Sequence, residues 1–163
     1  MFSQRWVGYI VILISFIVAL VLSVYPLPLS LRWWRPEFVL LLSIYWISVF
    51  PTTISLAFIC SVGLFEDLLE GVPFGQHSLS LIIIAYICVL SYQRVRNFAL
   101  WKESAWIFVL VGLAQLPDNW VQSMAGRPLS GLVFLAPAFT SALLWPVLRV
   151  VMDSASSHYR INP

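Results

Sequence analysis

The chain has 163 residues, of which 61% are hydrophobic and 10% are charged, and its formal net charge is +2. An ordinary soluble domain carries about 25% charged residues, so this composition argues against one. The basic residues are scattered along the sequence, which indicates no patch of the kind that binds nucleic acid.

Four long stretches contain no charged residue: residues 6–31, 38–65, 71–93 and 128–148. A helix of about 20 mostly apolar residues crosses a hydrocarbon core roughly 30 Å thick. Such a helix also satisfies its own backbone hydrogen bonds, which lipid requires. The sequence therefore predicts an all-α polytopic membrane protein that forms one integral-membrane domain over residues 1–163.

The first predicted span covers residues 6–25. It is too long for the apolar part of a signal peptide, and no small-residue cleavage pattern follows it, so we expect it to be retained. A proline-rich loop comes next, in which Trp33 and Trp34 lie beside Arg32 and Arg35. This mixture is typical of a membrane interface.

The second charge-free stretch, residues 38–65, is too long for one span. A single straight helix of this length would measure about 42 Å, against a core of ~30 Å. Pro51 lies near its middle, and proline interrupts a helix because it lacks an N–H and its ring clashes with the preceding turn. We therefore predict two spans, at 36–50 and 52–69, with Pro36 in the first turn of the former.

Three more spans are predicted at residues 78–92, 104–124 and 128–150, which gives six transmembrane helices. The tail, residues 151–163, is polar, and we expect it to be frayed.

The distribution of Lys and Arg predicts the orientation of these spans. With both termini inside, the inner side holds more basic residues than the outer side. A five-span arrangement with the N-terminus outside gives a slightly stronger bias, so charge alone does not decide, and Pro51 favours six spans. In the six-span arrangement the inner residues are Arg5, Arg94, Arg96, Lys102, Arg149 and Arg160, and the outer residues are Arg32, Arg35 and Arg127.

Charged residues at membrane depth are costly, so they are candidates for function. Near the end of the third span, Gly63, Asp67, Gly71 and Gly75 recur at intervals of four. Residues i and i+4 share a helix face, so Gly63 would let another backbone approach close to Asp67. Gly71 is expected to cap the helix, with a turn after it. Two interpretations stay open: Asp67 points into the bundle and holds a polar partner, or it is solvated at the helix terminus.

Asp118 and Arg35 are the other charged candidates. Asp118 follows Pro117 inside the fifth span; alternatively, that span ends at Pro117 and Trp120 marks the interface. In the six-span arrangement Asp67, Asp118 and Arg35 share the outer layer, so we expect Arg35 to pair with one of the two aspartates. The alternative is that Arg35 extends to lipid headgroups.

The sequence contains no P-loop, nucleophile elbow, HExxH or dinucleotide-binding motif. Cys60 and Cys88 lie in apolar runs and are expected to be small buried residues, and no cluster of metal ligands is present. His77 is interpreted as a loop histidine. Asp67 and Asp118 could share a proton as a protease dyad does, but neither lies in a motif typical of intramembrane aspartyl proteases. We therefore expect no enzyme, no cofactor and no metal.

Several short segments carry a resemblance to a known family. They are residues 35–41, Tyr45 and Trp46, residues 63–75 around Asp67, residues 94–101 including Arg96, and residues 144–146. In this order and spacing the chain resembles the MreD family of rod shape-determining proteins of Gram-negative bacteria. Glu70 departs from the pattern, since a small residue is expected before Gly71, and Asp118 matches only loosely.

The resemblance implies a six-span inner-membrane protein with both termini in the cytoplasm. Its fold would be similar to that of the substrate-binding subunits of energy-coupling-factor transporters. It would be a non-catalytic part of the cell-elongation complex that binds the membrane helix of MreC and helps couple the cytoskeleton to peptidoglycan synthesis. MreB, RodA, the elongation transpeptidase and membrane lipid are the further expected partners, and nucleic acid is not.

The alternative function, by the same resemblance, is a subunit that binds a small or lipidic ligand in an outward-facing cavity. A partner helix would need a lipid-facing groove with small side chains, for which Ala57 and Gly63 are candidates.

Overall fold

The computed structural model describes residues 2–26, 28, 34–51, 54–95, 97–124, 126 and 135–158, without the side chains of 2–7, 92, 157 and 158. Over this part of the chain the elements are six α-helices, which confirms the predicted all-α class. They are α1 (Phe2–Val24), α2 (Phe38–Val49), α3 (Leu56–Glu70), α4 (Gln76–Val95), α5 (Leu100–Met124) and α6 (Ala136–His158).

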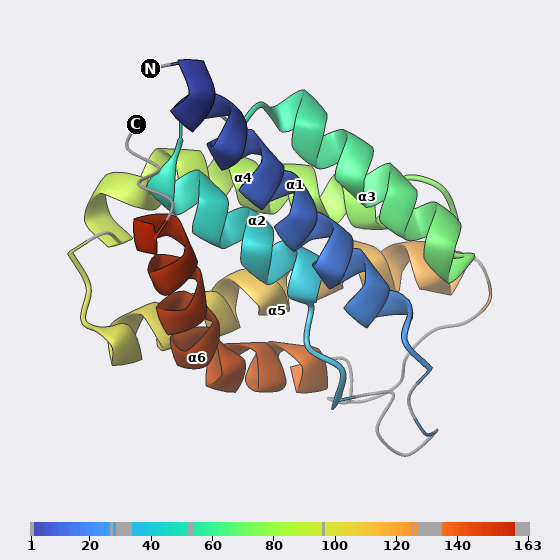
Figure 1. Ribbon diagram of the computed structural model, residues 1–163. Coiled ribbons are helices and arrows are strands. Elements are labelled where there is room, and N and C mark those ends of the chain that lie inside the picture. Colours follow the sequence, from blue (N-terminus) through green and yellow to red (C-terminus); the bar gives the residue numbers. More distant parts are fainter. Residues whose placement is uncertain are drawn as a thin grey trace.

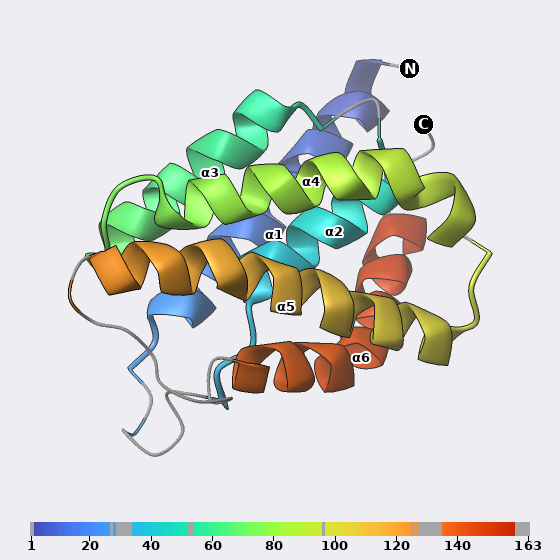
Figure 2. The same ribbon diagram turned by 180° about the vertical axis from the view of Figure 1, so that it is seen from behind.

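Successive helices run in opposite directions, so their ends gather on two sides of a bundle (Figures 1 and 2). One side, toward the right of Figure 1, collects the last turns of α1, α3 and α5 with the first turns of α2, α4 and α6; we call it the first end. The opposite side carries the turn between α4 and α5, and we call it the second end.

Helix α2 is the centre of the bundle, with α1, α4 and α6 packed on it. Residues 39–47 are all buried, as expected for a helix that is apolar on every side. Trp46 stacks on Phe50 at a ring distance of 5.9 Å, and its indole N–H donates to the Ser15 hydroxyl over 2.9 Å. This hydrogen bond fixes α1 on α2 within the core.

The predicted break at Pro51 is confirmed, because Pro51 lies in the turn between α2 and α3. Helix α3 starts at Leu56 rather than at 52, since Ser55 caps it: the Ser55 hydroxyl accepts the Phe58 N–H. Helix α2 starts at Phe38, so the prediction that Pro36 occupies its first turn is wrong.

The last three helices differ from the predicted spans at their ends. Helix α4 starts at Gln76, before the predicted 78, and α5 starts at Leu100, before 104. Helix α5 also continues through Pro117 to Met124, so the alternative that it ends at Pro117 is wrong.

Helix α6 covers part of the predicted sixth span and continues into the tail that was expected to be frayed. It is described from Ala136, and the predicted start at 128 falls in residues 127–134, which lie outside the described part of the chain. It continues to His158, so the prediction of fraying is wrong for 151–158, where Asp153 is bonded to Tyr45 of α2. It bends along its length (Figures 1 and 2), as expected for a helix that contains Pro146.

Over the residues that the structure describes, no helix combines the length and the apolarity that a membrane crossing requires. The helices themselves are therefore observed, whereas the six membrane crossings, their orientation and the single integral-membrane domain remain predictions.

Candidate functional site

The turn from α3 to α4 is set by two glycines with positive φ. Gly71 ends α3 at φ +67°, and its N–H donates to the Asp67 carbonyl, which confirms the predicted cap. Gly75 follows at φ +93°. A side chain at either position would be strained, because L-residues rarely adopt this conformation. The turn brings the first residues of α4 back beside Asp67.

Asp67 is 1% exposed and is surrounded by hydrogen-bond donors. Its Oδ2 atom accepts the Gly75 N–H over 2.8 Å. Its Oδ1 atom accepts the His77 N–H over 2.8 Å and lies 2.9 Å from His77 Nδ1. The interpretation in which Asp67 points into the bundle and holds a polar partner is therefore confirmed.

His77 is buried at the start of α4, so its interpretation as a loop histidine is wrong. Its Nε2 atom lies 3.8 Å from Glu70 Oε2. Arg35 Nη2 in turn lies 3.6 Å from Glu70 Oε1. The predicted pairing of Arg35 with Asp67 or Asp118 is thus wrong: the α4 backbone and His77 occupy Asp67, and Glu70, one turn later, faces the arginine.

Glu66 and Glu70 connect α3 to α1 through one hydroxyl. Ser23 Oγ lies 3.0 Å from Glu66 Oε1 and 2.8 Å from Glu70 Oε1. A hydroxyl carries one proton, so it donates to one of these carboxylates at a time. Glu66 is 3% exposed, so its carboxylate is buried between α3 and α1.

Asp118 and Glu37 extend these contacts across the bundle. The Ser80 hydroxyl on α4 donates to Asp118 on α5. Gln115 Nε2, one turn earlier on α5, donates to Glu37 Oε1 over 3.0 Å. The Glu37 N–H donates to Ser141 Oγ on α6, also over 3.0 Å.

Together these side chains form one polar cluster at the first end, which we call the acidic layer. Its carboxylates connect α1 to α3, α4 to α5, and the start of α2 to α5. Burying such groups is costly unless each finds a partner, and here each carboxylate has one. The members are Ser23, Arg35, Glu37, Glu66, Asp67, Glu70, His77, Ser80, Gln115 and Asp118.

The acidic layer has the geometry of neither a serine-type catalytic triad nor an aspartyl-protease dyad. A serine-type triad needs the second ring nitrogen of the histidine on a nucleophile, but His77 Nε2 faces the Glu70 carboxylate. Asp67 and Asp118 are bonded to His77 and Ser80 respectively, rather than to each other as in a protease dyad. Within the described residues no group of His, Cys, Asp and Glu is placed to hold a metal ion.

Gly63 allows the close contact between α3 and α4. A Cβ atom at this position would lie 2.6 Å from Ser78 Cα, which confirms the predicted backbone approach. The Ser78 hydroxyl donates to the Cys60 carbonyl over 3.1 Å in the same contact. Because α4 occupies this face, the prediction that Gly63 lines a lipid-facing groove is wrong, whereas Ala57 is exposed.

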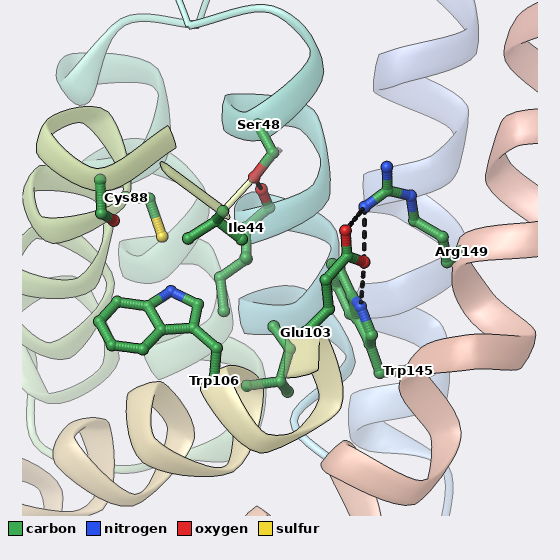
Figure 3. A pocket seen from close by; sticks show the side chains of 10 residues that line it. Ile44, Ser48, Cys88, Glu103, Trp106, Trp145 and Arg149 are labelled. Atoms are coloured by element: carbon green, nitrogen blue, oxygen red, sulfur yellow. Dashed lines mark hydrogen bonds and ion pairs between the residues drawn. The ribbon is translucent and has the colours of Figure 1, made fainter. Parts of the chain in front are cut away.

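A second polar cluster lies at the other side of the bundle, around Glu103 in the first turn of α5 (Figure 3). Glu103 is 3% exposed. Its two oxygens lie 2.8 and 2.7 Å from Arg149 Nη1, and Oε2 also accepts the Trp145 indole N–H over 3.1 Å. Trp145 and Arg149 flank Pro146, so one carboxylate holds both sides of the proline in α6.

Hydrogen bonds connect Arg149 to α2 through Asp153. Arg149 Nε donates to Asp153 Oδ2 over 3.3 Å, and Asp153 Oδ1 accepts the Tyr45 O–H over 2.7 Å. We call Tyr45, Glu103, Trp145, Arg149 and Asp153 the Glu103 cluster. It borders a narrow recess that Cys88 and Trp106 also line (Figure 3).

Of the predicted site residues, Arg35, Asp67 and Asp118 lie in the acidic layer, and Gly63, Gly71 and Gly75 shape the turn beside it. Pro36 precedes α2, and Arg96 lies outside the described residues. Cys88 is buried as expected, and Cys60 is half-buried.

His77 and Glu103 are not among the predicted site residues, although a helical pattern marks both. Glu103 and Asp118 lie on the stripe of α5 that includes the buried residues Ile107, Leu110 and Ala114. Spacings of three and four along a helix define one face. His77 has the same relation to Leu81, Ile84 and Cys88 of α4. A polar residue on such a stripe is expected to be buried.

The comparison with known families now decides the family. The model of a family described as rod shape-determining protein MreD matches residues 4–155. The chain belongs to the MreD family. A protein of Haemophilus influenzae, described as Rod shape-determining protein MreD, is 30% identical over 141 residues, which cover 86% of this chain and 87% of the relative. No solved structure matches. The resemblance noted from the sequence is confirmed, and both polar clusters lie within the matched region.

Proposed function

We propose that this MreD-family chain is a non-catalytic, membrane-embedded subunit of the bacterial cell-elongation complex. Family membership supports the role in rod shape, because the similar Haemophilus protein is described as rod shape-determining. The acidic layer supports the structural part of the proposal, since its side chains bond to one another and join helices.

The placement of polar and apolar side chains is the observation that carries the membrane part. Four acidic side chains are buried in the bundle, while many large apolar side chains are exposed on its surface; the buried acids are Glu66, Asp67, Glu103 and Asp118. Extended exposed apolar surface marks contact with lipid or with another protein. Helix α1 shows this most clearly, with exposed Tyr9, Ile10, Leu13, Ile14, Ile17, Val18, Val21 and Leu22.

The proposed orientation places the second end and both termini at the cytoplasm, in agreement with the bias of Lys and Arg in the sequence. The acidic layer would then lie at the outer side of the inner membrane. In this arrangement the exposed helix faces are available to partners within the bilayer.

The proposed partners are MreC, through its membrane helix, and more broadly MreB, RodA and the elongation transpeptidase. A helix partner in lipid binds through close packing and a few interhelical hydrogen bonds rather than through apolar burial. The subunit would thereby help couple the cytoskeleton to peptidoglycan synthesis.

Depletion in the native host tests this proposal. Rods should become round when the chain is depleted, rod shape should return on expression from a plasmid, and MreC should co-purify with the tagged chain. Alkaline carbonate washing should leave the chain in the membrane fraction. Normal rods after deletion, or release by carbonate, would contradict the proposal.

A further inference from the structure

The turn between α4 and α5, at the second end of the bundle, has a one-sided charge. The sequence contains no Asp or Glu from residue 71 to residue 102. Arg94 lies in the last turn of α4, Lys102 lies in the first turns of α5, and both side chains are exposed. Figures 1 and 2 show this turn on the side of the bundle opposite the turn from α3 to α4.

The nearest acidic residue, Glu103, does not compensate these charges at the surface. Its carboxylate is turned inward, where Arg149 and Trp145 hold it. Lys102 also gains nothing from its helix, because a cation near a helix N-terminus opposes the helix dipole. Among the residues that the structure describes, no acidic side chain forms an ion pair with Arg94 or Lys102.

Apolar side chains surround the two cations. Trp101 is 71% exposed, Leu100 49% and Phe98 39%. Lys102 Nζ lies 5.4 Å from the centre of the Trp101 ring, in a cation–π contact. A cation beside an exposed indole and aliphatic side chains matches the boundary between phosphate headgroups and acyl chains.

We propose that Arg94, Phe98, Leu100, Trp101 and Lys102 form a binding surface for anionic phospholipid headgroups. The two basic side chains contact the phosphates, and Trp101, with its apolar neighbours, enters the acyl boundary. The surface thereby holds the second end of the bundle at the face of the membrane. This proposal rests on the membrane placement proposed above.

Thermal unfolding of the purified full-length chain in detergent tests this surface. Added phosphatidylglycerol should raise the Tm by several degrees more than the same amount of phosphatidylcholine, because a ligand that binds the folded state stabilises it. The difference should shrink as sodium chloride is raised, since salt screens exposed charges.

The variants separate charge from packing. Arg94→Gln with Lys102→Gln should abolish the difference between the two lipids, and Trp101→Ala should reduce it. Arg94→Lys with Lys102→Arg keeps both charges and should preserve it. Trp120→Ala removes an indole of similar exposure, 63%, near the other end of α5 and should leave the difference unchanged.

A wild-type chain without preference for phosphatidylglycerol, or a double glutamine variant that keeps the full preference, would overturn the inference. A preference that survives high salt would also contradict it, because contacts between exposed basic side chains and headgroup phosphates are screened by salt. Release of the chain by carbonate is a separate result, because it would contradict the membrane placement itself.

Discussion

The two polar clusters of the bundle bury acidic side chains in different ways. At the second end, the Glu103 carboxylate meets Arg149 and Trp145, so its charge has a cation of its own. At the first end, Glu66 and Asp118 are bonded to the hydroxyls of serines. A buried carboxylate can therefore form one ion pair with a dedicated cation, or it can accept hydrogen bonds from hydroxyls in a network that joins several helices.

The two arrangements should respond differently when one member is removed. Loss of one partner from a buried ion pair leaves the other charge uncompensated, which is strongly destabilising. A carboxylate bonded to a rotatable hydroxyl can be replaced by an amide with little change in geometry, because the hydroxyl reorients.

The largest effect is expected for Glu103→Ala. It leaves Arg149 without its buried partner and frees the indole N–H of Trp145, so the free energy of unfolding should fall by about 3–5 kcal/mol. Denaturant unfolding in detergent micelles measures this loss of stability. Asp153→Ala removes the other, half-exposed partner of Arg149 and the acceptor of the Tyr45 O–H. Its loss should be smaller, about 1–3 kcal/mol, because solvent screens the ion pair and one buried donor loses its acceptor. Equal losses for the two variants would contradict the special role of Glu103.

Asp67→Asn should be the next largest effect. Each carboxylate oxygen of Asp67 accepts a backbone N–H, one from Gly75 and one from His77. An asparagine would turn its NH₂ group toward one of these two donors. The unsatisfied donor should cost about 1–3 kcal/mol of unfolding free energy. Hydrogen exchange should show faster opening of the α3–α4 turn. A loss below the error of the measurement would show that the donors are not matched to the carboxylate.

Gly63→Ala should destabilise the contact of α3 with α4 by about 1–3 kcal/mol, because the added methyl group overlaps the Ser78 backbone. The same substitution at Gly112 is the control, since a Cβ there meets only a Leu135 methyl group at 3.6 Å. Comparison of the two melting temperatures checks this. A tolerated alanine at Gly63 would mean that α3 and α4 can separate without cost.

The smallest effect is expected for Glu66→Gln. The amide oxygen can still accept from Ser23, so the loss of stability should stay below about 1 kcal/mol. Glu66→Ala, which removes the acceptor and leaves a cavity, should cost more. If glutamine were as damaging as alanine, the negative charge of Glu66 itself would be required, and the contrast between the two clusters would fail.

Local features of the sequence predicted much of the fold. The helix break at Pro51 and the cap at Gly71 follow from backbone chemistry that neighbouring residues cannot change. The predicted start of α3 at 52 is wrong because Ser55 caps the helix. The continuation of α5 beyond Pro117 depends on packing, since Asp118 is anchored to Ser80 of another helix.

The location of the acidic layer was easier to predict from the sequence than the residues that pair within it. The spacing of Gly63 and Asp67 predicted the close helix contact and left two interpretations of Asp67 open, of which the buried one is confirmed. The predicted partner of Arg35 is wrong because the choice among Glu70, Asp67 and Asp118 depends on which helices are neighbours. That information is not contained in the periodicity of any one segment.

A double-mutant cycle on Asp67 and His77 tests most directly the claim that the acidic layer joins the helices. Asp67→Asn, His77→Gln and the double variant would be unfolded in the same lipid and detergent mixture. The account predicts that the double variant loses less stability than the sum of the single losses, with a coupling of about 1–3 kcal/mol between the contacting residues. Purely additive losses would contradict it, because they would show that the Asp67 and His77 side chains contribute to stability independently of each other.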